Sequence, residues 1–193
     1  MVSNDFSHAF ETALVRQCAP TLAGMKSGSI FCFHHLSLEV SRQKVCQWNE
    51  RLTPLGLTVQ MLLERPKSDS GIVFVYWHDW LKQVLSDDAC QNFLAQAGYV
   101  RTDLNGMLEQ LSYRLRTQRE FPHEIGVFLG YPLRDVIGFI ENQGQNFTCC
   151  GFWKCYGDPS ETQEYFACCR KCIQTYVAMF EQGIPIERLV VPA

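Results

Sequence analysis

The sequence predicts an α+β fold in a single domain spanning residues 1–193, with a small antiparallel or mixed sheet packed against several helices. The chain has 193 residues, of which 47% are hydrophobic and 19% charged, so it is long enough to bury a core. Runs rich in aromatic and β-branched residues at 29–35, 57–64 and 71–77 predict three strands. The turn-rich segment "RPKSDS" separates the last two runs, which predicts a hairpin and therefore antiparallel pairing.

Local signals place the elements of the first half. A helix is predicted over residues 5–18, and Pro20 is expected to interrupt it because proline cannot donate the helical hydrogen bond. After the first strand, Ser37 is expected to cap a second helix, and Gly56 to end the connection that follows it. The apolar stripe of this second helix comprises Leu38, Val45, Trp48 and Leu52.

The second half is mostly helical. Its elements are predicted as short helices at 79–85 and 87–96, a clearer helix after Asp103, two helices around Gly130, β structure at 146–156, a long helix from Asp158 to Gly183, and a final strand at "IERLVV". The long helix has the clearest boundaries, because Asp158 can cap it, Pro159 suits its first position and Gly183 can end it.

The segment "EIGVFLGYPLRDVIGFIEN" predicts a helix-turn-helix-like hairpin. Its turn is expected at Gly130, with Gly126 allowing close packing and Val136 and Ile140 facing inward. A DNA-reading helix needs groups that reach phosphates and base edges, but this one offers Arg134 alone against two acidic residues. Charge therefore argues against nucleic acid as a partner and favours a hairpin packed into the core.

Composition limits the class of protein further. The net charge is −3 and the pI about 5.9, so the chain has no bulk charge for binding polyanions. No run of 18 apolar residues is present, which predicts no membrane span. The start, "MVSNDFSHAFETALVRQ", lacks a basic region followed by an apolar one, so we expect no secretion signal and a cytoplasmic protein.

Cysteine usage raises the question of a metal or redox site. The chain has 10 cysteines, and six cluster between Cys149 and Cys172. Cys150-x4-Cys155 with Cys169-x2-Cys172 offers four thiolates, a set that zinc or an iron–sulfur cluster accepts. The alternatives are buried structural thiols, since Cys169 and Cys172 lie on an apolar helix stripe, and redox or nucleophilic thiol chemistry.

Three stretches, "RQCAPTLAGMKSGSIF", "FPHEIGVFLGYPLRDVIGFIENQGQNF" and "GFWKCYGD", resemble an uncharacterised bacterial family, the domain of unknown function 3793. The resemblance covers nearly the whole chain, and the name implies no activity. The family pattern implies cysteine at positions matching Cys18, Cys149 and Cys172. It usually has another residue at positions matching Cys150 and Cys155, which weakens a metal site built on those two.

Two histidine motifs are further candidates. His123 and Glu124 follow Pro122 at an expected helix start, where the helix dipole favours a neutral imidazole that can act as a base or ligand. The alternative is local capping. In "FCFHH", Cys32 and His34 share one face of the predicted strand and suggest a metal pair, although a hydrogen-bonded core histidine is the simpler interpretation.

A polar loop suggests a ligand pocket. The loop "ENQGQN" follows an apolar helix and precedes "CCGFWKCYGD". The residues expected to line the pocket are Glu141, Asn142, Asn146, Trp153, Lys154 and Tyr156. The alternative is a half-buried strand with an exposed lysine.

These observations favour an accessory protein that binds a small ligand, a metal or a redox cofactor where "FPHEIG", "ENQGQN" and "CCGFWKCYGD" converge. Candidate metal ligands are Cys18, Cys149, Cys169 and Cys172, for zinc, iron or an iron–sulfur cluster. One alternative is an enzyme that uses His123 or Glu124 as a base, or a cysteine thiolate as a nucleophile. Another is a helix-turn-helix-like regulator or a protein-interaction module, so the partner is a small molecule or a protein.

Overall fold

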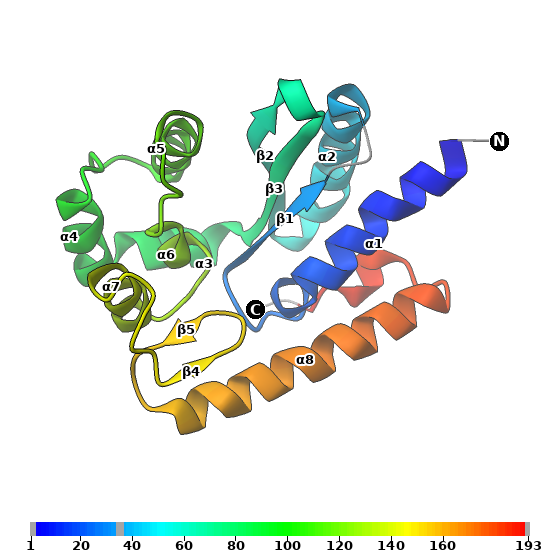
Figure 1. Cartoon of the computed structure of the whole chain (residues 1–193). Coiled ribbons are helices and arrows are strands. Elements are labelled where there is room, and N and C mark those ends of the chain that lie inside the picture. Colours follow the sequence, from blue (N-terminus) through cyan, green and yellow to red (C-terminus); the bar gives the residue numbers. More distant parts are fainter. Residues whose placement is uncertain (1–2, 34–36, 192–193) are drawn as a thin grey trace. The chain divides into compact units, whose positions relative to one another are not determined.

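The computed structural model describes residues 3–33 and 37–191, with side chains from residue 8 onward in these ranges (Figure 1). His34 of the predicted Cys32–His34 metal pair lies outside the described residues, as does His35. The chain divides into two compact units: unit 1 comprises Met1–Asp79 and Lys171–Ala193, and unit 2 comprises Trp80–Arg170. Whether the two units form one domain stays a prediction.

Unit 1 contains the predicted antiparallel sheet. Its strands are β1 (Gly28–Phe33), β2 (Leu57–Arg65) and β3 (Ser70–Trp77), in the order β1-β3-β2. Both outer strands run antiparallel to β3, which is buried along its whole length. The "RPKSDS" segment forms the expected hairpin connection through a short 3-10 turn, η2 (Pro66–Ser68). The predicted α+β class is therefore confirmed.

Two helices of unit 1 pack on this sheet: α1 (Ser3–Leu22) and α2 (Leu38–Leu52). The Phe10 ring of α1 meets Phe31 of β1 edge-on, with centroids 5.3 Å apart. The Glu11 carboxylate accepts hydrogen bonds from Lys44 Nζ at 2.9 Å and Trp48 Nε1 at 3.0 Å, which ties α1 to α2. The Ser37 cap is confirmed, because its hydroxyl accepts from the Val40 amide.

Two boundary predictions in unit 1 are wrong. Pro20 lies inside α1, which continues to Leu22; near a helix end proline removes one hydrogen bond and its φ is already helical. "IERLVV" is not a strand but forms the 3-10 helix η3 (Ile186–Leu189), because Ile186 and Leu189 are both buried at the three-residue spacing of such a turn.

The remaining elements follow the predicted order. They are η1 (Thr53–Leu55), α3 (His78–Ser86), α4 (Asp88–Gln96), α5 (Leu104–Thr117), α6 (Ile125–Phe128), α7 (Leu133–Glu141), β4 (Cys149–Cys150), β5 (Lys154–Cys155) and α8 (Pro159–Glu181). Helix α8 begins in unit 2 and ends in unit 1. Within the described ranges, no helix has both the length and the apolar character needed to cross a membrane.

The helix-turn-helix-like hairpin is present as α6 and α7. Gly130 has a φ of 73° at the turn, which favours glycine. A Cβ added at Gly126 would lie 2.7 Å from Val136 Cγ2, so the predicted close packing is confirmed. Val136 is buried as expected, but Ile140 is 40% exposed because α7 ends one residue later, at Glu141.

Candidate functional site

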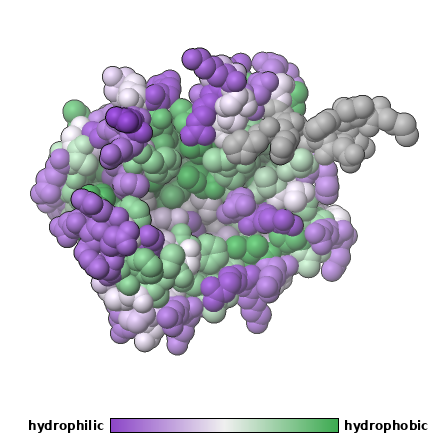
Figure 2. Space-filling view, viewed as in Figure 1, coloured by the Kyte–Doolittle hydropathy of each residue, from purple (hydrophilic) through white to green (hydrophobic). Residues whose placement is uncertain are grey.

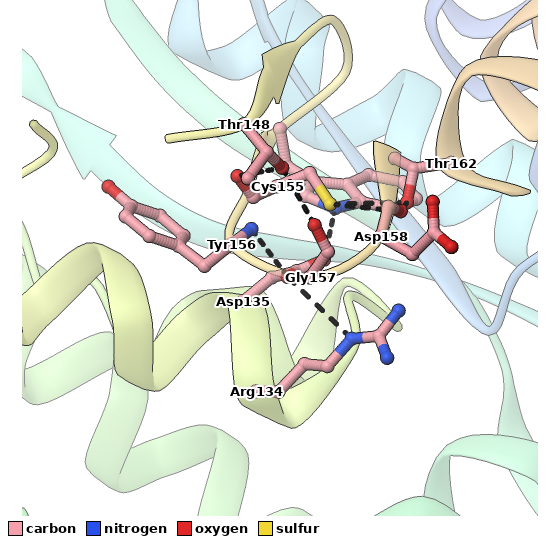
Figure 3. A network of polar contacts seen from close by, with 9 residues as sticks. Arg134, Asp135, Thr148, Cys155, Tyr156, Gly157, Asp158 and Thr162 are labelled. Carbon is pink, nitrogen blue, oxygen red and sulfur yellow. Dashed lines mark hydrogen bonds and ion pairs between the residues drawn. The ribbon is translucent and has the colours of Figure 1, made fainter. Parts of the chain in front are cut away.

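A buried carboxylate organises the part of unit 2 that carries the candidate site. Asp135, in the first turn of α7, is 2% exposed. Its Oδ2 accepts a hydrogen bond from Trp153 Nε1 at 2.8 Å, and its Oδ1 accepts one from the Tyr156 amide at 2.9 Å. Trp153 precedes β5 and Tyr156 follows it, so one carboxylate holds both ends of that strand against α7 (Figure 3). Each carboxylate oxygen thus accepts a hydrogen bond, as a buried polar group requires, and Arg134 Nε lies 3.9 Å from Oδ1.

Aromatic packing completes this junction. The Trp153 ring stacks on Tyr131 at a centroid distance of 4.9 Å and meets Phe166 of α8 edge-on at 4.6 Å. A Cβ at Gly138 would lie 2.5 Å from the Tyr156 ring, so α7 approaches the hairpin as closely as a glycine allows. The region predicted as β therefore forms two short strands whose position depends on side chains outside them.

The inner side of the hairpin is a polar network around Cys155. The Thr148 amide donates to the Cys155 carbonyl at 2.8 Å, and the Thr148 hydroxyl lies 2.8 Å from the Gly157 carbonyl. The Cys155 thiol is fully buried, 3.2 Å from the Thr162 hydroxyl and 3.7 Å from the Asp158 carbonyl (Figure 3). These contacts attach the hairpin to the first turn of α8.

Within unit 2 the structure brings together the three segments that were expected to converge. Lys154 Nζ donates to the Gly144 carbonyl at 2.7 Å and lies 4.8 Å from the Phe147 ring centroid. It also lies 5.7 Å from the Phe139 ring, which is 4.7 Å from the ring of His123. "FPHEIG", "ENQGQN" and "CCGFWKCYGD" thus meet through Lys154 and its aromatic neighbours.

These side chains form a solvent-accessible aromatic surface. We use that name for Phe121, His123, Phe139, Phe147 and Lys154, which are joined by ring and cation–π contacts. Phe121 is 44% exposed and Phe147 is 40% exposed. In the face drawn in Figure 2, hydrophobic residues likewise reach the surface between hydrophilic ones. Exposed aromatic rings in contact with one another are a feature of interaction sites.

The other predicted pocket residues have local roles. The Asn142 side chain donates to the Gly138 carbonyl at 2.8 Å and satisfies the end of α7, and Asn146 reaches Asn142 Oδ1 at 3.5 Å. Glu141 is exposed. Trp153 and the Tyr156 amide are held by Asp135, so of the six predicted residues Lys154 is the one in the aromatic surface.

His123 and Glu124 point to different surroundings. The His123 side chain is exposed and its ring lies beside that of Phe139, whereas Glu124 is buried. Glu124 Oε1 lies 3.4 Å from Arg114 Nη1 and 3.3 Å from the Tyr99 hydroxyl. Burial first, and then the Glu124 charge, raise the pKa of Tyr99. Glu124 thus serves a buried ion pair with α5, a partner that the local sequence did not reveal.

A cavity of about 410 Å³ lies along α5. Its lining includes Gly98, Gln110, Tyr113, Arg114, Thr117 and Gln118. The Arg114 guanidinium is fixed there, because Nη2 donates to the Ala97 carbonyl at 2.6 Å and the group lies 4.3 Å from the Tyr99 ring centroid. This cavity was not predicted, because the residues that line it form no recognised ligand-binding motif.

The candidate metal ligands are distributed over both units. Cys18 and Cys172 belong to unit 1, and Cys149 and Cys169 to unit 2. Burial raises the pKa of Cys18 from 9.0 to about 12, against an opposing effect of Lys26, so this thiol stays protonated at neutral pH. Among the described residues, no group of three or more His, Cys, Asp and Glu side chains is arranged to hold a metal ion.

The fold and the site define a small α+β protein whose unit 2 exposes an aromatic surface held by a buried aspartate. A family model described as "Protein of unknown function (DUF3793)" matches residues 14–190, so the chain belongs to that family. Neither the curated proteins nor the solved structures contain a match.

Asp135→Asn is expected to destabilise unit 2. The amide keeps the shape of the carboxylate but turns an N–H₂ group toward one of the two donors, so a buried N–H loses its acceptor. We expect a loss of about 1–3 kcal/mol in the free energy of unfolding, measured by urea denaturation followed by tryptophan fluorescence. Glu141→Gln is the matched control, because Glu141 is an exposed carboxylate at the end of the same helix. Equal stability of Asp135→Asn and the wild type would contradict the role given to this carboxylate.

Proposed function

We propose that unit 2 is a protein-interaction module, and that its aromatic surface binds an apolar peptide segment of a partner that carries an acidic residue. The observation that carries the proposal is the continuous series of contacts from Phe121 through His123 and Phe139 to Lys154 and Phe147. Interfaces are enriched in aromatic side chains and depleted in lysine, so a lysine held among rings suggests a specific role.

The chemistry of Lys154 supports an acidic group in the partner. An ammonium has three N–H donors, and the Gly144 carbonyl accepts one of them. The neighbouring rings partly shield the charge from water, which strengthens its attraction to a carboxylate. Apolar side chains flanking that carboxylate would bury the exposed parts of Phe121 and Phe147.

The backbone around Lys154 supports binding without large rearrangement. Asp135 fixes the residues on both sides of β5, Trp153 and Tyr156. The Gly144 carbonyl fixes the side chain of Lys154 itself. A surface whose groups are already ordered loses less conformational entropy when a peptide binds, which leaves more of the contact energy for affinity.

A peptide library displayed on phage and selected on the full chain tests this proposal. We expect enrichment of peptides with Asp or Glu beside Leu or an aromatic residue. Phe147→Ser and Lys154→Gln should each weaken binding of a selected peptide about tenfold or more, the effect of a central interface residue. Phe152→Ser is the matched control, because Phe152 is 37% exposed and lies outside the aromatic surface.

The salt dependence of peptide binding separates the ionic contact made by Lys154 from the apolar contacts made by the aromatic rings. Binding to wild type should weaken as salt rises, and binding to Lys154→Gln should respond less. No enriched peptide, or equal losses for Phe147→Ser and Phe152→Ser, would refute the aromatic surface as a binding site.

A further inference from the structure

The hairpin of unit 2 places two thiols opposite each other. Cys149 of β4 and Cys155 of β5 are direct partners in the antiparallel register. Directly opposite residues in such a pair have Cα atoms about 4.5–5.5 Å apart, within the range of about 4.4–6.8 Å that a disulfide spans. The Cys155 thiol is also among the neighbouring groups that raise the pKa of Cys149. The backbone is therefore already placed for a bond between them.

We propose that Cys149 and Cys155 form a reversible dithiol–disulfide site that reacts with small disulfides. Their positions opposite each other on the two strands bring the sulfur atoms within bonding reach. The two thiols also differ in exposure to solvent, which a stepwise exchange with an external disulfide requires. The proposal concerns the chemistry of the hairpin and does not depend on peptide binding by the aromatic surface.

The difference in access assigns the roles of the two thiols. Cys149 is half-buried, whereas Cys155 is fully buried. The Thr162 hydroxyl and the Asp158 carbonyl hold the Cys155 thiol at 3.2 and 3.7 Å (Figure 3). An external disulfide therefore reaches Cys149 first, and Cys155 is the internal thiol that completes the exchange.

The reaction balances with a disulfide as oxidant. The Cys149 thiolate attacks one sulfur of the external disulfide, a mixed disulfide forms and one thiolate leaves. Cys155 then loses its proton and attacks the Cys149 sulfur, which expels the second thiolate. Two cysteine thiols and one external disulfide thus become one cross-strand disulfide and two external thiols, with two electrons passed to the oxidant. A small dithiol reverses the sequence.

The surroundings of Cys149 predict that the exchange is faster in alkali. Burial raises the pKa of Cys149, and the neighbouring Cys155, Asp135 and Cys150 raise it further. The attacking species is the thiolate, so at neutral pH only a small fraction of Cys149 is reactive. We expect the rate of oxidation to keep rising with pH beyond the pKa of an ordinary cysteine.

Peptide mapping after oxidation tests the proposal on the full chain. The reduced protein is incubated with glutathione disulfide, blocked with an alkylating reagent, and digested with trypsin, which cleaves after Lys154 and separates the two cysteines. We expect tandem mass spectrometry to locate the link between Cys149 and Cys155, whose peptide also contains Cys168 and Cys169. Cys150→Ser is the matched control, because Cys150 faces Lys154 in the register; it should keep the link. Cys149→Ser should lose it completely.

The Cys155 variant distinguishes exchange from simple modification. In Cys155→Ala, Cys149 should retain glutathione as a mixed disulfide, because the thiol that would displace it is missing. Cys149 is half-buried, so Cys149→Ser is expected to fold. Loss of the link in that variant tests the proposal even if the variant at buried Cys155 does not fold. A wild-type protein that carries glutathione on Cys149 without closing the link would overturn the proposal. A first disulfide that joins Cys149 to another cysteine would overturn it as well.

Discussion

The Asp135 carboxylate is the interaction on which the arrangement of unit 2 depends. It is buried in the first turn of α7 and accepts N–H groups from Trp153 and Tyr156, on either side of β5. A two-residue strand has too few backbone hydrogen bonds to hold its own position. The two hydrogen bonds to the carboxylate therefore fix the position of this hairpin, which in an ordinary sheet is fixed by a longer series of backbone hydrogen bonds. The aromatic packing of Trp153 adds to this stabilisation.

Both chemical features of unit 2 lie on the strand that Asp135 holds. Lys154 of β5 is the centre of the aromatic surface, and Cys155, the next residue, faces Cys149 across the hairpin. Because neighbouring residues of a strand point to opposite sides, one short strand presents a cation to the surface and a thiol to the interior. A change in the position of β5 would therefore alter both features.

Local signals predicted most of the elements, and long-range contacts explain what they missed. The Ser37 and Asp158 caps were predictable because each cap binds an amide two or three residues away. The donors to Asp135 lie 18 and 21 residues away, and Arg114 lies 10 residues from Glu124, so no local pattern reveals either partnership. The convergence of the three segments was predicted, whereas the central place of Lys154 among them and the cavity along α5 were not.

Hydrogen exchange of two N–H groups, followed by NMR, tests the role of Asp135 most directly. If the carboxylate holds both ends of β5, the Trp153 indole N–H and the Tyr156 amide exchange slowly and with the same opening free energy, because one local opening exposes both. Rapid exchange of either group in the folded protein, or opening free energies that differ clearly between them, would contradict the account.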